Sequence, residues 1–176
     1  MLRIGIFLFK NATLAYKKES IMNNFKYTLR AYTKQDYEFV YYTKKEAYKI
    51  YVEANWGKWN EEQQRKMFVQ FIDTYGKDIK IIMEADKKIG FYHVEELENG
   101  DCEIGNICII PEFQGRGIGT KILKDILETH KNKDIYLRYF KQNPVAKLYK
   151  RLGFEMIEEM PYHFKMVLKA KEKTKE

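Results

Sequence analysis

Hydrophobic positions along the chain change their spacing several times between residues 25 and 168. A spacing of two predicts strands, whereas a spacing of three and four predicts helices. The predicted strands cover residues 25–31, 79–85, 88–95, 101–110, 134–140, 154–158 and 163–168. The predicted helices cover residues 33–52, continuing or resuming at Ala47, and then 60–75, 118–130 and 143–152.

The order of these segments predicts one α/β (α+β) domain over residues 25–168. Turns at Asp86-Lys87 and Asn99-Gly100 join the second, third and fourth strands, so we expect an antiparallel meander there. The full sheet is expected to be mixed, with about seven strands and about four helices. We interpret residues 169–176 as a charged tail and residues 1–24 as an N-terminal extension, with Met22 as an alternative natural start.

Composition indicates a folded protein with its own core. Hydrophobic residues make up 45% of the 176 residues and aromatic residues 15%, more than disordered chains carry. No uncharged apolar run reaches the ~18 residues of a membrane helix. Cys102 and Cys108 would lie roughly 20 Å apart on one strand, too far for a disulfide. We therefore expect a cytoplasmic protein with no membrane contact and no metal site.

The net charge of +7 raises the question of nucleic-acid binding. The first 24 residues hold four basic residues and one acidic residue, and the last eight hold four basic and two acidic ones. The remainder holds 24 basic residues against 22 acidic ones, so the fold itself is close to neutral. We therefore expect no nucleic-acid partner.

The segment 107–120 carries the most specific chemical signal. A predicted strand is followed by glycines at alternate positions, Gly115, Gly117 and Gly119, and a helix begins at once. Glycine lets the backbone approach a ligand closely, and the first amides of a helix attract anions. The spacing fits neither a P-loop nor a dinucleotide fingerprint. The segment predicts a pyrophosphate site, with a tight turn that binds nothing as the alternative.

The motif Gln114-x-x-Gly117-x-Gly119, directly after a strand, resembles the acyl-coenzyme-A signature of the GNAT superfamily of N-acetyltransferases. The resemblance implies acetyl-CoA as cosubstrate and an amine as acceptor. It also implies a mixed, mostly antiparallel sheet with helices on both faces. The fourth and fifth strands would splay apart to admit the pantetheine arm.

A second segment supports this resemblance. Asn143-x-x-Ala146-x-x-Tyr149 is similar to the second motif of the superfamily, and the order of elements agrees over residues 25–168. The resemblance implies a cofactor-binding set of Ile107, Cys108, Ile109, Gln114, Gly115, Arg116, Gly117, Ile118, Gly119, Thr120, Asn143, Ala146 and Tyr149. Within this set the backbone amides of 115–120 would hold the pyrophosphate, framed by Gln114 and Arg116.

Transfer from a thioester to an amine needs a base, an oxyanion site and an acid. The resemblance places the oxyanion at a backbone N–H around Ile109, and the acid at Tyr149. Glu103 is the candidate base, because a separation of six residues puts it on the same strand face as Ile109. The alternatives are a solvated Glu103 paired with a lysine and a Tyr149 that only fills the core.

Other residues admit several interpretations. His93 and His163 lie on strands that would flank the acceptor cleft, so either is an alternative base. His130 ends a helix, where the dipole favours a cation. An aromatic group, consisting of Tyr48, Tyr51, Trp56 and Trp59, forms either a wall for the amine or part of the core.

The resulting prediction is an N-acetyltransferase that acts by direct attack in a ternary complex, with a small-molecule primary amine as acceptor. Acetylation of a protein N-terminus or lysine is an alternative, as is a non-catalytic acyl-CoA sensor. Neither cysteine supports a covalent intermediate, since no base is predicted beside Cys108. The sequence is compatible with a monomer or a homodimer.

Overall fold

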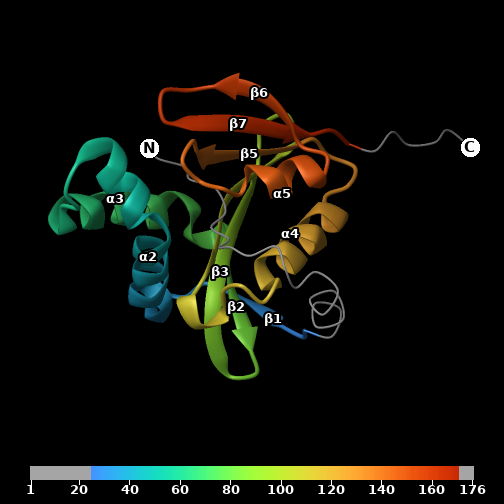
Figure 1. Ribbon diagram of the computed structural model, residues 1–176. Helices are drawn as coiled ribbons and strands as arrows, with labels where there is room; N and C mark the ends of the chain where they lie inside the picture. The colour runs from blue at the N-terminus through green and yellow to red at the C-terminus, as the bar shows by residue number, and fades with distance from the viewer. Residues whose placement is uncertain (1–24, 171–176) are drawn as a thin grey trace, which may run out of the picture.

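The computed structural model describes residues 25–170 and contains a seven-stranded sheet with helices on both faces (Figure 1). The strands are β1 (Thr28–Ala31), β2 (Ile79–Glu84), β3 (Lys87–Glu96), β4 (Cys102–Ile109), β5 (Ile135–Phe140), β6 (Glu155–Glu159) and β7 (His163–Leu168). The α-helices are α2 (Tyr37–Trp56), α3 (Glu61–Tyr75), α4 (Ile118–Thr129) and α5 (Ala146–Arg151), and η1 (Lys34–Asp36), η2 (Gly76–Asp78) and η3 (Pro111–Phe113) are 3-10 turns. The predicted fold class is confirmed.

The strand order is β1-β2-β3-β4-β5-β7-β6, and every neighbouring pair is antiparallel except β4 and β5. This parallel pair is short. It runs from Cys102 opposite Ile135 to Ile104 opposite Leu137 and then stops, although both strands continue. The carboxyl-terminal halves of β4 and β5 therefore diverge, which confirms the expected splay.

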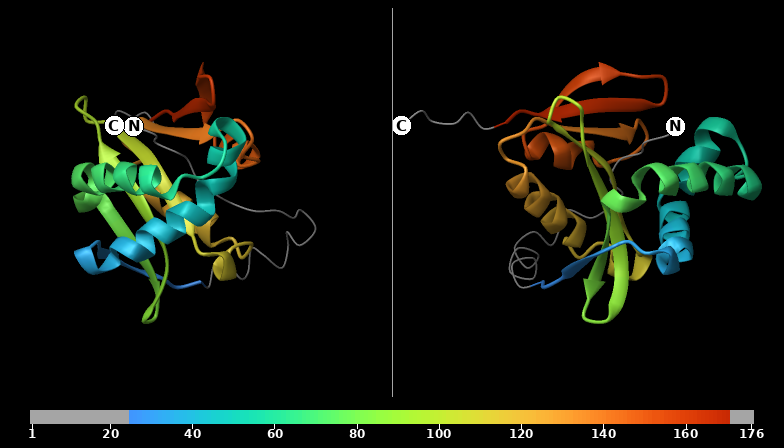
Figure 2. Two further views of the ribbon diagram at one scale, coloured as in Figure 1. Left: turned by 90° about the vertical axis from the view of Figure 1, so that its left-hand side faces the viewer. Right: turned by 180° about the vertical axis from the view of Figure 1, so that it is seen from behind.

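Each face of the sheet has its own core. The amphipathic helices α4 and α5 cover one face, where Ile107, Ile109 and Tyr149 are buried in a common cluster. Helices α2 and α3 cover the other face, where Tyr48 and Cys108 are buried. Figure 1 shows the two pairs of helices on opposite sides of the sheet, and Figure 2 shows α2 and α3 crossing the near face.

A bulge in β4 changes which residues face each core. The register between β3 and β4 shifts between His93 and Val94, so Gly105 is an extra residue that has no partner on β3. A Cβ atom at Gly105 would lie 2.4 Å from Nδ1 of His93, so only glycine fits beneath this ring. Because one added residue reverses the alternation of side chains, Glu103 faces α2 and α3, opposite to Ile109.

The element boundaries agree with the sequence patterns, with three differences. Strand β1 begins at Thr28 and not at residue 25. Helix α2 continues without a break to Trp56, and Gly57, with φ of 85°, ends it. Helix α5 begins at Ala146, later than expected, because Asn143 and the proline after it form a turn. Asn60 caps α3, since its side chain accepts a hydrogen bond from the Gln63 amide.

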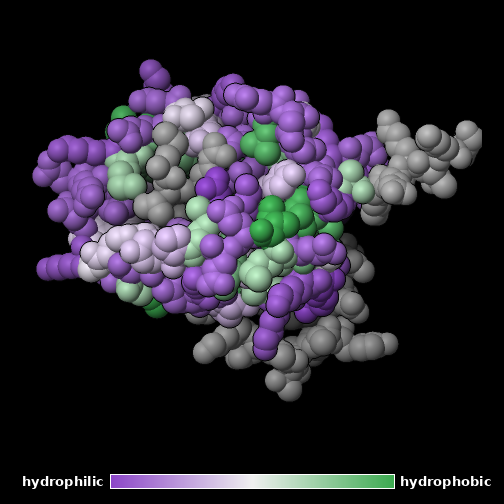
Figure 3. Space-filling model, turned by 90° about the horizontal axis from the view of Figure 1, so that it is seen from above, coloured by the Kyte–Doolittle hydropathy of each residue, from purple (hydrophilic) through white to green (hydrophobic). Residues whose placement is uncertain are grey.

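Strand β6 forms one edge of the sheet and exposes Met156 and Ile157. Seen from above, the surface is mainly hydrophilic with small hydrophobic areas (Figure 3). Among the described residues, no helix has the length and apolar character needed to cross a bilayer. The predicted N-terminal extension and most of the predicted tail lie outside the described residues.

Candidate functional site

The glycine loop turns directly from η3 into α4. Gly115 and Gly117 have φ of 74° and 82°, a left-handed conformation that side chains disfavour. Helix α4 makes its first backbone bond from the Lys121 amide to the Gly117 carbonyl. The amides of Ile118, Gly119 and Thr120 therefore have no acceptor within the helix. An anion placed at this helix start would meet several unpaired donors and the positive end of the helix dipole, which fits the predicted pyrophosphate site.

Two cations lie beside the loop. The Arg116 guanidinium lies 4.7 Å from the centre of the Phe113 ring, and the Lys87 ammonium lies 4.8 Å from the same ring. Arg116 was expected here, but Lys87 was not. Lys87 begins β3 and is distant from the loop in sequence, so no local pattern pointed to it.

Gln114 has a different contact from the one expected. Its side-chain amide donates a hydrogen bond of 2.7 Å to the Ile109 carbonyl and so fastens the loop to the end of β4. The expected contact of Gln114 with the pyrophosphate stays a prediction. In this structure Gln114 fixes the position of the loop.

The backbone of β4 directs an amide into the splay. The Ile110 amide donates to the Ile89 carbonyl, so Ile110 is hydrogen-bonded towards β3. Successive residues of an antiparallel strand point their backbone groups to opposite edges. The N–H of Ile109 therefore points towards β5, where the two strands no longer pair. This amide is suitably placed to meet an oxyanion between β4 and β5.

Tyrosines from both faces approach each other at the splay. Tyr149 is fully buried and packs against Tyr139, with 5.4 Å between ring centres. The hydroxyl of Tyr48, from α2, lies 3.7 Å from the Cys108 sulfur. Burial raises the pKa of Tyr48 well above its usual value, and Cys108 and Tyr149 raise it further. Tyr149 thus belongs to the core and also borders the splay.

Asn143 and Ala146 shape the turn that precedes α5. The Asn143 side chain is buried and accepts a hydrogen bond of 3.0 Å from the Val145 amide. Asn143 therefore stabilises the turn that leads into α5, which begins at Ala146. Ala146, the first residue of α5, packs against the core below α4.

Glu103 corrects two expectations. It does not share a face with Ile109, because the bulge at Gly105 lies between them. It is also not a solvated partner of a lysine: it is 4% exposed, and Arg138 of β5 donates to its Oε1 from Nη2 at 2.8 Å and from Nε at 3.1 Å. The carboxylate therefore lies on the face covered by α2 and α3, bridged to the neighbouring strand.

The three histidines are packed against other groups. His93 lies between Phe71 and Tyr75, with ring centres 5.7 and 4.5 Å away. His163 stacks on Phe140, and burial together with Arg138 lowers its pKa to about 4. Burial also lowers the pKa of His130, so the expected cation at the end of α4 is not supported.

The aromatic group divides into two parts. Tyr48 and Tyr51 belong to the core under α2. Trp56 is 43% exposed and contacts Tyr162 of the β6–β7 turn, with 4.7 Å between ring centres, and Phe140 at 5.9 Å. Trp56 and Tyr162 therefore form an exposed aromatic surface where α2, β5 and β7 meet.

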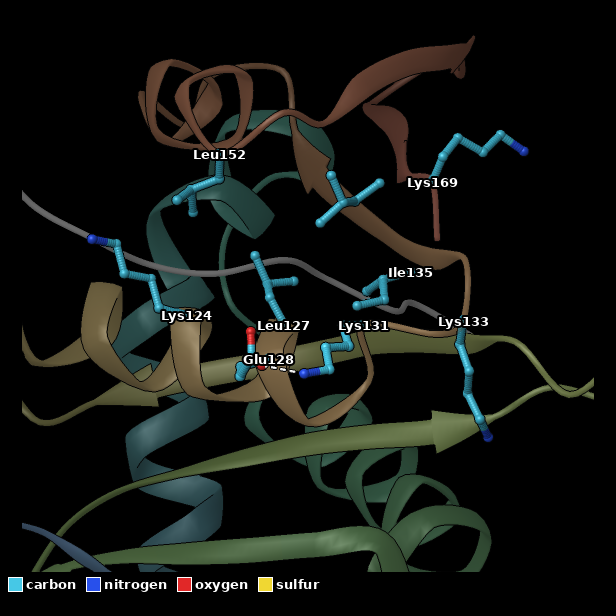
Figure 4. A pocket seen from close by; sticks show the side chains of 9 residues that line it. Lys124, Leu127, Glu128, Lys131, Lys133, Ile135, Leu152 and Lys169 are labelled. Atoms are coloured by element: carbon cyan, nitrogen blue, oxygen red, sulfur yellow. Dashed lines mark hydrogen bonds and ion pairs between the residues drawn. The ribbon is translucent and has the colours of Figure 1, made fainter. Parts of the chain in front are cut away.

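A hollow of about 300 Å³ lies at the other end of α4 (Figure 4). Its lining residues are Lys124, Leu127, Glu128, Lys131, Lys133, Ile135, Leu152, Leu168 and Lys169. Three of its four lysines already pair with carboxylates of the chain. The hollow is separated from the glycine loop by most of the helix, so it is not the predicted pyrophosphate site.

The splayed parallel pair and the glycine loop at the start of α4 define a fold class that comparison with known proteins identifies. Residues 76–156 match the family model described as the acetyltransferase (GNAT) domain. The spermine/spermidine N(1)-acetyltransferase of Bacillus subtilis (strain 168) is 34% identical over an alignment of 106 residues that covers 53% of this chain and 69% of that protein.

Solved structures show the same fold. The PaiA N-acetyltransferase of Thermoplasma acidophilum, in complex with coenzyme A, has a TM-score of 0.61 at 19% identity and covers 81% of this chain and 98% of its own. The ribosomal-protein-S18-alanine N-acetyltransferase of Escherichia coli has a TM-score of 0.60 at 15% identity, with coverage of 85% and 97%. The chain belongs to the GNAT superfamily of N-acetyltransferases and is an acyltransferase.

Proposed function

We propose that the protein transfers an acetyl group from acetyl-CoA to a primary amine of a small molecule, by direct attack in a ternary complex. The observation that carries this proposal is the alignment of two backbone features. The amide-rich start of α4 follows β4 within a few residues, and the Ile109 amide points into the splay. A pyrophosphate held at the first feature would direct the attached thioester arm towards the second.

The oxyanion and acid roles follow from this placement. Negative charge that develops on the thioester carbonyl oxygen would be stabilised by the Ile109 N–H, a donor fixed by the sheet. Tyr149 would give its phenolic proton to the departing thiolate, a role that suits a phenol with an unperturbed pKa near 10. Its burial at the edge of the splay supports this role.

The base must act from the face opposite α4, where the amine would arrive. Glu103 remains our proposed base, with a bound water as relay, because it lies on that face. Its bond to Arg138 holds the carboxylate in one orientation. His163 is less suitable, since a pKa of about 4 makes it a weak proton acceptor.

The acceptor would approach past Trp56 and Tyr162. Aromatic faces attract alkylammonium groups, and this aromatic surface contacts Phe140, at the end of β5 that no longer pairs with β4. This aromatic surface and the similarity to a spermine/spermidine acetyltransferase make a polyamine the first acceptor to test. We also propose a cytoplasmic location, which the two free buried cysteines support.

Thiol release from acetyl-CoA tests this proposal. The purified chain is mixed with acetyl-CoA and, in separate reactions, with spermidine, a monoamine, an amino acid and a peptide with a free N-terminus. We expect thiol release that depends on an added amine and is fastest with spermidine. Release with the peptide alone would favour a protein acceptor. Binding of acetyl-CoA without release in any reaction would favour the sensor.

A further inference from the structure

Lys44 of α2 is a partly buried lysine whose amine has no carboxylate beside it among the described residues. Its Nζ donates a hydrogen bond of 2.8 Å to Oδ1 of the buried Asn106, on β4. The same nitrogen lies 4.6 Å from the ring centre of Phe71 and 4.9 Å from that of Tyr48. Among residues 25–170 no Asp or Glu forms an ion pair with it, so its charge is compensated only by a neutral amide and aromatic faces.

This environment raises the fraction of Lys44 that carries an unprotonated amine. A buried ammonium loses hydration that only a carboxylate would fully replace. Burial lowers the pKa of Lys44 to about 8, and Cys108 opposes this shift only in part. An unprotonated primary amine is the nucleophile that an N-acetyltransferase requires. At pH 8 about half of the Lys44 side chains would therefore carry the unprotonated amine that an acceptor needs, far more than for an ordinary lysine.

The position of Lys44 also matches that of an acceptor. Asn106 and Cys108, its neighbours on β4, both follow the last residue that pairs with β5, so they belong to the splayed half of the strand. Tyr48 lies one turn further along α2. Its ring contacts the Lys44 ammonium and its hydroxyl contacts the Cys108 sulfur, and Tyr149 contributes to its pKa shift. The amine therefore lies on the side of the splay opposite α4, and the four-carbon lysine side chain is long and flexible enough to change its position there.

We propose that Lys44 is a site of self-acetylation, an inference that rests on the proposed function. In the absence of another amine, the Nζ lone pair forms a bond to the acetyl carbonyl carbon and the carbon–sulfur bond breaks. The thiolate leaves with the electron pair and takes a proton from Tyr149, while Nζ releases one proton that returns to the tyrosinate through solvent. The products are an amide on Lys44 and free coenzyme A.

Mass spectrometry of the full chain tests this inference. The protein is incubated with acetyl-CoA and no amine, its intact mass is followed, and the modified residue is located by peptide mapping. We expect one acetyl group on Lys44, at a rate that saturates with acetyl-CoA and falls when coenzyme A or spermidine is added. Lys44→Arg keeps the charge but removes the acceptor, and should abolish the addition.

Lys45 provides a matched control on the same helix. Its ammonium pairs with Glu61 at 2.7 Å, outside the core. Lys45→Arg should leave the acetylation of Lys44 unchanged, and Lys44 should react at least about tenfold faster than Lys45, because Glu61 holds the Lys45 ammonium in an ion pair. A chain that acetylates added amines but leaves Lys44 unmodified, or modifies Lys45 as fast, would overturn this inference alone. A chain that takes up no acetyl-CoA in calorimetry would overturn the proposed function, and the inference with it.

Discussion

The two faces of the sheet would contribute to the proposed site in different ways. On the α4 face the relevant groups are backbone amides, supplied by one continuous segment from Ile109 to Thr120. On the α2 face they are side chains from distant elements, such as Lys44, Glu103, Arg138 and Trp56. A backbone site tolerates changes in most side chains and depends on glycine, whereas a side-chain site depends on each residue. The difference explains why a family can keep its acyl donor while its acceptor changes.

The largest effect is expected on turnover, from a substitution at Tyr149 beside the splay. Tyr149→Phe removes one hydroxyl and keeps the ring, so we expect turnover to fall by about 10² or more, as for loss of a general acid. Affinity for acetyl-CoA should change little. Tyr139→Phe is the control, since Tyr139, a buried tyrosine of β5, packs against Tyr149. Steady-state kinetics and calorimetry measure both quantities, and equal effects of the two variants would contradict the assigned role.

A glycine pair tests whether the α4 face acts through its backbone. Gly115 and Gly100 both have positive φ, 74° and 84°, with open space where a Cβ would be added. Alanine at either position costs on the order of 1 kcal/mol of stability through the same strain. Only Gly115→Ala should weaken acetyl-CoA binding, by about tenfold, which corresponds to ~1.4 kcal/mol. Similar affinities for the two variants would show that the loop does not hold the donor.

A tryptophan pair examines the acceptor side. Trp56→Leu removes the exposed aromatic face, so we expect KM for spermidine to rise by about fivefold, as the loss of one exposed cation–π contact implies. KM for acetyl-CoA should stay constant. Trp59→Leu is the control, because the Trp59 indole instead donates to Glu61, at 2.9 Å. A rise in the acetyl-CoA KM would mean that the two faces are not separate sites.

The smallest effect concerns stability. Burial lowers the pKa of His163 to about 4, below the usual value near 6.5. Between these values the unfolded chain binds more protons than the folded one, so stability rises as pH increases from about 4 to 6.5. His163→Phe should remove this part of the dependence, on the order of 2 kcal/mol. Urea unfolding of the original protein and the variant between about pH 4 and 6.5 measures how the free energy of unfolding depends on pH. The same pH dependence in both proteins would refute this assignment.

Prediction from the sequence succeeded where the information is local. Hydrophobic spacing gave the strands and the α4 helix, and the motif around Gly117 indicated the loop. Prediction failed where a single inserted residue alters the register of a strand. The bulge at Gly105 places Glu103 on the opposite face from Ile109, and the six-residue separation of these two residues does not reveal the bulge. The contacts of Glu103 with Arg138 and of Lys44 with Asn106 join elements far apart in sequence. No local pattern specifies such pairs, because the topology of the sheet brings them together.

A crystal structure of the chain with coenzyme A tests the central claim most directly. We predict that the pyrophosphate oxygens accept hydrogen bonds from the amides between Gly115 and Thr120, and that the pantetheine arm passes between β4 and β5 towards Ile109. Coenzyme A bound instead in the lysine-rimmed hollow near Lys124, or absent at saturating concentration, would contradict the account.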